Sequence, residues 1–191
     1  MELRTHDIRL ADGELVLRPM TEGDWGIILP WHMEPEVLYY SEGDQVTTRT
    51  LAEVQMIYRG VAEHAFNFIA EVEGRPIGDC WLQEMNLERV LSRYPRNLDL
   101  RRIDLEIGDK TLWGCGLGTR MIALLVEFGF EVEHADAIFG CCIGDYNQRS
   151  RRAFEKNGFV IDEVIAQPDG GKAKEVYDMV LRREGYDGLR K

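Results

Sequence analysis

Apolar and ionisable residues alternate between Arg102 and Ile107, and this period of two predicts a strand with one apolar face. Glycines then occupy every second position from Gly114 to Gly118. The segment from Thr119 to Val132 is mostly apolar and predicts a long helix. The chain is therefore expected to pass from a strand through a glycine-rich loop into a helix N-terminus. Free backbone N–H groups and the positive end of the helix dipole suit a phosphate group there.

The glycine-rich loop does not match the common nucleotide-binding motifs. A dinucleotide fingerprint needs GxGxxG followed about 20 residues later by a carboxylate, and a P-loop needs GxxxxGK[ST]. The sequence from Gly114 to Thr119 has neither the spacing nor the lysine. A plain strand-to-helix turn is the remaining alternative to a phosphate site, because glycine is common in turns.

The first half of the chain predicts a series of short elements. They are a strand at 10–18 with an Asp12-Gly13 turn, helices that begin at Thr21 and at Pro35, a helix at 48–61, and strands at 66–72 and 76–83. Thr21 and Asp24 have the spacing of a helix cap, and Pro35 suits a first helical turn. Residues 73–75 contain Gly74 and predict a hairpin turn between the two strands.

The second half predicts one parallel strand pair. Its expected elements are a helical turn within 85–100, a strand at 135–143, a helix at 147–157 ended by Gly158, and strands at 159–166 and 175–181. One helix separates the strand before the glycine-rich loop from the strand at 135–143, so these two should run parallel through a right-handed crossover. The order of elements predicts an α+β fold in one domain that spans residues 1–191.

Composition and charge limit the classes of partner. The 191 residues are 45% hydrophobic and 30% charged, which is ordinary for a soluble domain. The chain has no apolar run of membrane-spanning length and no signal-peptide pattern, so a cytoplasmic protein without a membrane partner is expected. The formal net charge of -11 argues against a nucleic acid partner, which requires clustered Lys and Arg. This charge suits a cationic small substrate, although acidity also serves solubility alone.

Cysteines and histidines give no metal or disulfide pattern. The four cysteines are Cys80, Cys115, Cys141 and Cys142, and they contain no CxxC motif. Buried thiols are therefore expected, with neither a disulfide framework nor a zinc site. His32, His64 and His134 lack the spacing of metal ligands, and no metal is expected.

Three features together resemble the GNAT family of acetyl-CoA-dependent N-acetyltransferases. They are the loop WGCGLGT, the asparagine seven residues before the segment FEKNGF, and the order of elements. The resemblance covers essentially the whole chain. It implies a mixed central sheet of about seven strands, flanked by helices, with splayed parallel strands around an acetyl-CoA site. The family pattern [QR]xxGx[GA] begins with a polar residue, whereas this loop begins with Trp113. The implied cofactor-binding residues are Ile107, Trp113, Gly114, Cys115, Gly116, Leu117, Gly118, Thr119, Asn147 and Phe154.

Within this family the chain is more similar to the aminoglycoside 6′-N-acetyltransferases. Residues 101–119 have the same length and layout as their strand-to-loop segment, and residues 68–79 look like their second hairpin. The resemblance implies a catalytic role for Asp104. The predicted substrate-binding residues are Tyr40, Asp104, Asp145 and Asp169, of which the resemblance implies Asp104 and Asp169, and ordinary packing is the alternative role for Tyr40. Two features depart from the pattern, because Cys142 stands where an aspartate is expected and residues 85–97 contain no tryptophan.

The expected chemistry requires a base. An aliphatic amine is protonated near neutral pH and attacks a thioester only after it loses a proton. Asp104 and Glu106 are the candidates for this base, since both project from one face of the strand that leads into the glycine-rich loop. Solvated strand carboxylates without a catalytic role are the alternative. Many relatives use a tyrosine to protonate the departing thiolate, and Phe154 stands in that place. The thiolate is expected to leave unprotonated, with Tyr146 as the alternative donor.

These patterns predict an enzyme that transfers an acetyl group from acetyl-CoA to a primary amine of a cationic molecule. The resemblance favours the 6′-amine of an aminoglycoside, with antibiotic resistance as the associated role, and Asp104 as the general base. Two alternatives remain. One is a ribosomal-protein type of protein N-terminal acetyltransferase, and the other is a non-catalytic acyl-CoA-binding module. Monomer and homodimer both remain open.

Overall fold

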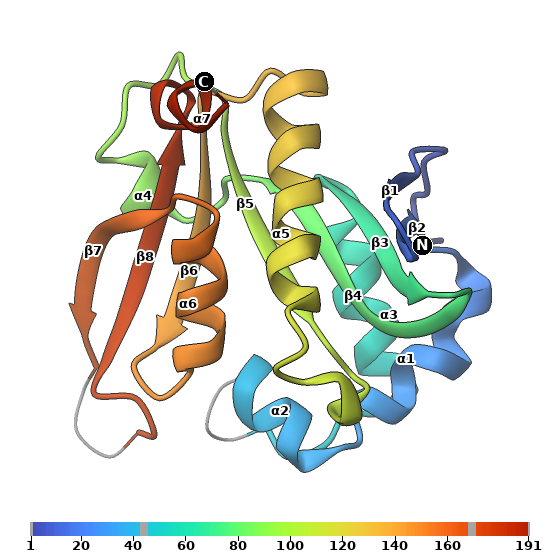
Figure 1. Cartoon of the computed structure of the whole chain (residues 1–191). Helices are drawn as coiled ribbons and strands as arrows, with labels where there is room; N and C mark the ends of the chain where they lie inside the picture. Colours follow the sequence, from blue (N-terminus) through green and yellow to red (C-terminus); the bar gives the residue numbers. More distant parts are fainter. Residues whose placement is uncertain (1, 43–45, 168–170, 191) are drawn as a thin grey trace. The chain divides into compact units, whose positions relative to one another are not determined.

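A computed structural model describes residues 2–42, 46–167 and 171–190 of the chain (Figure 1). The chain forms two compact units, of which the first holds Met1–Trp81 with Leu105–Met121 and the second holds Leu82–Asp104 with Ile122–Lys191. The elements of the first unit are β1 (Leu10–Asp12), β2 (Leu15–Pro19), η1 (Glu22–Asp24), α1 (Trp25–Trp31), α2 (Pro35–Ser41), α3 (Leu51–Val61), β3 (Ala65–Val72) and η2 (Lys110–Leu112). Those of the second unit are α4 (Glu88–Leu91), η3 (Phe128–Val132), β6 (Ala137–Gly144), α6 (Gln148–Lys156), β7 (Val160–Ala166), β8 (Glu175–Arg182) and α7 (Arg183–Leu189). Residues of both units contribute to β4 (Arg75–Glu84), β5 (Leu100–Glu106) and α5 (Leu117–Glu127).

Eight described strands form a mixed sheet in the order β1-β2-β3-β4-β5-β6-β8-β7, which confirms the predicted α+β class. The prediction of one strand at 10–18 is wrong, because these residues form the β1–β2 hairpin and so raise the strand number from about seven to eight. The chain reverses at Gly13, whose φ of +57° is rarely adopted by residues with a side chain. Leu15 and Leu17 are fully buried on one face of β2, as their alternation predicts.

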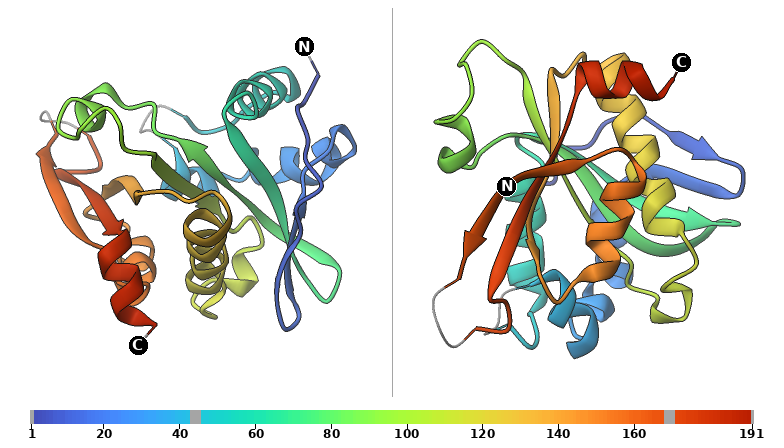
Figure 2. Two further views of the ribbon diagram at one scale, coloured as in Figure 1. Left: turned by 90° about the horizontal axis from the view of Figure 1, so that it is seen from above. Right: turned by 60° about the vertical axis from the view of Figure 1, so that its left-hand side comes forward.

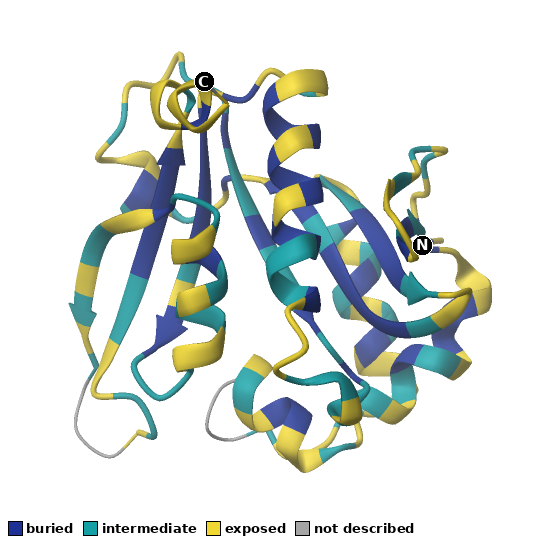
Figure 3. Ribbon diagram, in the orientation of Figure 1, coloured by how far each residue is buried: buried dark blue, intermediate teal, exposed yellow. Residues whose placement is uncertain are grey.

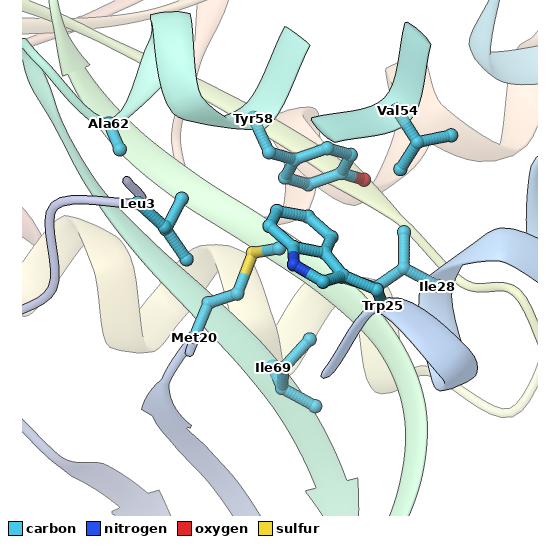
Figure 4. Close-up of a cluster of buried hydrophobic side chains, with 8 residues drawn as sticks. All are labelled: Leu3, Met20, Trp25, Ile28, Val54, Tyr58, Ala62 and Ile69. Atoms are coloured by element: carbon cyan, nitrogen blue, oxygen red, sulfur yellow. The ribbon is translucent and has the colours of Figure 1, made fainter. Parts of the chain in front are cut away.

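The core of the first unit lies among α1, α3, β3 and the chain ahead of η1. Figure 4 shows Trp25 and Tyr58 beside Met20, Ile28 and Ile69 in this cluster. The Trp25 and Tyr58 rings meet edge to face, with centroids 6.3 Å apart. Helix α3 begins at Leu51 and not at 48, because the Thr50 hydroxyl accepts a hydrogen bond from Glu53 N at 3.3 Å and caps the helix.

The cap predicted at Thr21 is confirmed. Thr21 Oγ1 accepts a hydrogen bond from Gly23 N at 3.3 Å, and the buried Asp24 carboxylate accepts one from Thr21 N at 2.8 Å. Arg18 binds the same carboxylate through two nitrogens at 2.7 and 3.0 Å. Burial opposes ionisation of Asp24, but the bonds from Arg18 and Thr21 outweigh it and lower the pKa of this carboxyl below its ordinary value.

Replacing Asp24 with asparagine is expected to lower the free energy of unfolding at neutral pH by about 2 kcal/mol, because charge-assisted bonds from Arg18 are lost. Since the folded pKa of Asp24 lies below the unfolded one, this contribution is complete above the unfolded pKa of about 4. It is lost as the pH falls through the folded pKa. Urea unfolding at neutral pH and at about pH 3 tests this. The gap between wild type and Asp24→Asn should shrink in acid, and a constant gap would contradict the ion-pair explanation.

The parallel pair predicted in the second unit is confirmed. Leu100 to Arg102 of β5 pair with Ala137 to Phe139 of β6. Of the described residues, Ile103 and Asp104 have no partner on β6, although β6 continues to Gly144. The end of the pairing agrees with the splay expected for this fold. Strand β8 pairs antiparallel with both β6 and β7, and Figure 2 shows these three strands side by side.

Strands β5, β6 and β8 also carry one core cluster of the second unit. The buried members of this cluster are Met85, Val90, Leu100, Ala137, Phe139 and Val180. Figure 3 shows β6 and the middle of β8 largely buried, whereas β7 at the edge of the sheet is exposed or intermediate along its length. Helix α4 is the helical turn expected between 85 and 100. Packing of Leu100 in this cluster fixes the beginning of β5, the strand that carries Asp104.

Two helices differ from the prediction. Helix α5 begins at Leu117, ends at Glu127 and continues as a π-helical turn, whereas one helix at 119–132 was expected. Helix α7 was not predicted, because its sequence REGYDGL contains two glycines and little helix propensity. A tertiary contact supports it, since the Tyr186 ring stacks on Phe130 with centroids 4.7 Å apart. Among the described helices, none has both the length and the apolar character needed to cross a membrane.

Candidate functional site

The glycine-rich loop follows η2 and leads into α5, as the sequence predicts. Gly114 and Gly116 have φ angles of +80° and +83°, which residues with a side chain rarely adopt. A Cβ atom at either position would meet no other atom within 4 Å. The backbone is thus open to a ligand at both glycines, just before the first N–H groups of an 11-residue helix. This arrangement is suited to an anion such as a diphosphate.

Trp113 attaches this loop to the end of β5. Its indole Nε1 donates a hydrogen bond to the Ile107 carbonyl at 2.7 Å, and its ring meets Tyr40 edge to face with centroids 5.6 Å apart. The Ile107 carbonyl, expected to bind a cofactor, therefore already accepts one bond. Tyr40 is half-buried and lies against Tyr39 as well as Trp113, so its predicted substrate contact stays a prediction.

Trp113→Phe is expected to weaken binding of acetyl-CoA several-fold, because the loop loses the hydrogen bond that fixes it to Ile107 while the ring contact with Tyr40 is kept. Isothermal titration calorimetry with acetyl-CoA measures the effect. Trp81→Phe is the control, because it removes an indole N–H that has no hydrogen-bond partner. Equal affinities in wild type and Trp113→Phe would show that the hydrogen bond from Trp113 to Ile107 does not determine the conformation of the loop that binds acetyl-CoA.

The start of α5 is fixed on its other side by ion pairs. Arg120 Nε lies 2.6 Å from Asp12 Oδ2, and its Nη1 lies 2.7 Å from Glu14 Oε1, so the first turn of α5 is bound to the β1–β2 hairpin. A Cβ at Gly118 would lie 3.6 Å from Leu105 Cδ1 and 3.7 Å from Ile107 Cδ1. Leu117 is buried, whereas Cys115 is exposed. The loop is thus held at both ends and open in its middle.

Asp104 is a partly exposed carboxylate on β5. Arg102 binds both of its oxygens, through Nε at 2.8 Å and Nη2 at 2.7 Å, and also contacts Asn86 Oδ1 at 3.2 Å. The Asp104 side chain is 25% exposed. A carboxylate has about four lone-pair sites, so Asp104 can still accept a proton or a hydrogen bond while Arg102 orients it.

Glu106 has a different environment, which the strand pattern did not reveal. The residue is 9% exposed, and its Oε1 is buried without a hydrogen-bond partner. Burial raises the pKa of Glu106 to about 7, the Ser41 hydroxyl acts in the opposite direction, and the Glu42 charge raises it further. The two carboxylates predicted to project from one face of the strand therefore differ in environment, because Asp104 is partly exposed and ion-paired while Glu106 is enclosed.

Glu106 lies beside His32 and Asp79, neither of which was predicted as a site residue. One ligand atom each from His32, Asp79 and Glu106 lies within 4.8 Å of the others. His32 Nε2 is 3.0 Å from the Tyr58 hydroxyl. Burial and the Glu106 charge raise the pKa of Asp79 well above its usual range, and burial lowers that of His32. The spacing of residues in the sequence did not indicate this cluster, because His32 follows α1 while Asp79 and Glu106 come from β4 and β5.

The predicted site residues of the second unit lie near β6. Asn147 is the N-cap of α6 and accepts a hydrogen bond from Ser150 N at 3.2 Å. Phe154 is 2% exposed and packs against Phe159 and Gly140, so its ring belongs to the core and a cofactor contact stays a prediction. Asp145 accepts a bond from Gln148 Nε2 through its carbonyl at 2.6 Å. Asp169 and its turn lie outside the described residues.

The thiols differ in exposure. Cys80 is buried as expected, but the expectation is wrong for Cys115 and Cys142, which are both exposed, while Cys141 is half-buried. Cys115 belongs to the open glycine-rich loop. Cys142 lies at an irregularity of β6 with a φ of +57°, and Arg89 Nη2 is 3.0 Å from its sulfur. Local backbone geometry, which the apolar pattern does not report, turns these thiols outward.

Comparison with known families agrees with this geometry. Residues 14–160 match the family model described as "Acetyltransferase (GNAT) domain". The chain belongs to the GNAT acetyltransferase family. This acetyltransferase is 27% identical over 195 residues to an aminoglycoside N(6′)-acetyltransferase type 1 of Serratia marcescens, with 95% of this chain and 89% of that protein covered. A Klebsiella pneumoniae protein of the same name is 27% identical over 194 residues, with 94% of this chain and 89% of that protein covered.

Solved structures show the same GNAT fold. The structure of AAC(6′)-Ib in complex with ribostamycin and coenzyme A has a TM-score of 0.78 and 26% sequence identity, and it covers 93% of this chain and 98% of that one. A spermidine N-acetyltransferase from Vibrio cholerae in complex with CoA and spermine has a TM-score of 0.74 at 16% identity, over 92% of this chain and 99% of that one. The second likeness concerns the fold alone.

Proposed function

We propose that this GNAT enzyme transfers an acetyl group from acetyl-CoA to the 6′-amine of an aminoglycoside. The observation that carries the proposal is the open glycine-rich loop at the start of α5, found in a chain that is 27% identical to aminoglycoside N(6′)-acetyltransferases over 95% of its length. The two compact units would act together as one acetyltransferase domain.

The residues present fit the diphosphate of coenzyme A. Gly114 and Gly116 leave their backbone open where a side chain would project, and the N-terminus of α5 adds N–H donors and a positive dipole. We assign the cofactor contacts to the loop from Trp113 to Thr119, with Ile107, Asn147 and Phe154 as further proposed contacts. When bound, acetyl-CoA supplies an activated thioester.

Asp104 is the proposed general base. A base must reach the proton that it removes, and the partly exposed Asp104 meets this condition whereas the enclosed Glu106 does not. The two hydrogen bonds from Arg102 fix the direction of the Asp104 carboxylate and leave lone pairs for the proton of a substrate ammonium group. Glu106 was the second candidate for the base. Because it is enclosed, it would affect the reaction only through the electrostatic field of its buried carboxyl group.

The acceptor is a polycation in this proposal. The net charge of -11 attracts such a molecule, and Tyr40, Asp104, Asp145 and Asp169 are the proposed substrate contacts. A lack of tyrosine at position 154 is compatible with a thiolate leaving group, because a thiol with a pKa near 8.5 leaves readily without prior protonation.

A direct assay tests the function. Purified enzyme is mixed with acetyl-CoA and a thiol-reactive dye, and release of CoA is followed with kanamycin, with spermidine or with a peptide that has a free N-terminus. Fast release with kanamycin alone would support the proposal. Release only with the peptide would replace it with protein N-terminal acetylation. Binding of acetyl-CoA without turnover on any acceptor would favour a non-catalytic module.

A further inference from the structure

We propose that His32, Asp79 and Glu106 form a binding site for a divalent transition-metal ion of the zinc class. His32 follows α1, Asp79 is on β4 and Glu106 is on β5, and all three belong to the first unit. One nitrogen or oxygen from each lies within 4.8 Å of the other two. The proposal does not depend on the proposed acetyl acceptor.

Several polar atoms of this cluster lack a hydrogen bond. His32 is 5% and Asp79 is 1% exposed. Within the described part of the chain, His32 Nδ1, both Asp79 carboxylate oxygens and Glu106 Oε1 are buried and have no partner in hydrogen-bond geometry, although the Tyr58 and Ser41 hydroxyls are close enough to act on Asp79 and Glu106. Buried polar atoms are normally paired, since an unpaired carboxylate in an apolar interior is costly. Four such atoms in one cluster indicate a shared ligand.

The cluster also holds two buried carboxylates, which need a compensating positive charge when they are ionised. The Arg49 backbone N–H donates to the His32 carbonyl at 2.9 Å, but the Arg49 guanidinium is already 2.7 Å from Glu42. A divalent cation would balance both carboxylates and leave the imidazole neutral, as a metal ligand must be.

The donor set and its support also fit such an ion. One imidazole nitrogen and two carboxylate oxygens suit zinc, with bonds of about 2.0–2.2 Å and a water molecule as a further ligand. Ligand atoms of a tetrahedral zinc ion lie about 3.4 Å apart, so these side chains, whose ligand atoms now lie within 4.8 Å of one another, would move closer together around the ion. Tyr58, hydrogen-bonded to His32, is the type of outer-shell group that orients a metal-binding histidine.

The backbone also favours the site. A Cβ at Gly78 would lie 2.1 Å from the Glu106 carbonyl oxygen, so β4 and β5 approach closely at the residue before Asp79. Glycine at this position therefore brings the strands that carry Asp79 and Glu106 together. The competing explanation is that the two carboxyl groups remain protonated and share their protons, in which case no ion is required.

The test is titration of the full-length protein, after treatment with a chelator, with Zn²⁺ and separately with Co²⁺. We expect one Zn²⁺ per chain by calorimetry, and a rise in melting temperature because only the folded chain holds the site. His32→Gln and Asp79→Asn should each weaken binding at least about tenfold. His64→Gln, which removes an exposed histidine by the same substitution, should bind like wild type.

The absorption spectrum of the Co²⁺ complex shows whether the exposed cysteines bind the ion. Thiolate ligands give an intense near-ultraviolet charge-transfer band that nitrogen and oxygen ligands do not give, and we expect no such band. Anomalous scattering from a Zn²⁺-soaked wild-type crystal should place the ion among His32, Asp79 and Glu106, and this measurement needs no variant to fold. Absence of stoichiometric binding would overturn the proposal and favour shared protons. A thiolate band, unchanged affinity in Asp79→Asn, or an ion located elsewhere would also overturn it.

Discussion

Gly116→Val is expected to lower the affinity for acetyl-CoA by at least about 100-fold while the protein remains folded. A valine at a φ of +83° is strained, and the loop would shift to relieve this strain. Its side chain would also project into the open space where the proposed diphosphate approaches, since a Cβ there meets nothing in the chain. Loss of several backbone hydrogen bonds to a diphosphate would account for this factor, because charge-assisted bonds contribute about 1.5–3 kcal/mol each.

Gly74→Val is the matched control. Gly74 has a φ of +78°, and a Cβ there also meets nothing within 4 Å, but the residue belongs to the β3–β4 turn. The two variants should lose similar stability in thermal unfolding, while only Gly116→Val loses acetyl-CoA binding in calorimetry. Equal binding by both variants would show that the glycine-rich loop is an ordinary strand-to-helix turn.

Asp104→Asn is expected to reduce kcat on an aminoglycoside by about 10²- to 10⁴-fold, with little change in acetyl-CoA affinity. Asparagine keeps the shape of the side chain and can accept a bond from Arg102, but it cannot take a proton from the substrate ammonium group. The activity of the variant should rise with pH, because free amine becomes available without a base. Steady-state kinetics over a range of pH measures both effects.

A second aspartate on the same segment provides the control for this variant. Arg101 donates to the Asp99 carboxylate through Nε at 2.5 Å and Nη2 at 2.8 Å. Asp99 is therefore ion-paired with an arginine two residues away, as Asp104 is with Arg102. Asp99→Asn should keep wild-type kcat. Similar losses in the two variants would assign the effect to the ion pairs and not to a base at Asp104.

Glu106→Gln separates the two predicted carboxylates. We expect it to retain most of the activity, because an enclosed side chain does not reach a substrate proton. It should weaken the proposed Zn²⁺ site, because a ligand is lost. Assays of CoA release and Zn²⁺ titration on the same preparation check both expectations. A loss of kcat as large as that of Asp104→Asn would identify Glu106 as the base.

The sequence by itself determined the features that depend on local pattern. Alternation in β5, the glycines at 114, 116 and 118, and the cap at Thr21 each depend on residues that are neighbours in the chain. One helix between β5 and β6 was enough to predict their parallel pairing, because such crossovers have one preferred hand. The family followed from the loop, the asparagine and the order of elements.

Only the tertiary structure decided which carboxylate is accessible and which is enclosed. Asp104 and Glu106 have the same place in the alternation, yet Arg102 orients one while Asp79, His32 and Ser41 surround or adjoin the other. The exposure of Cys142, and the stacking of Tyr186 in α7 on Phe130, could not be predicted from the sequence either. A periodic pattern reports which side of an element is apolar, whereas burial and charge at one atom depend on residues from distant segments.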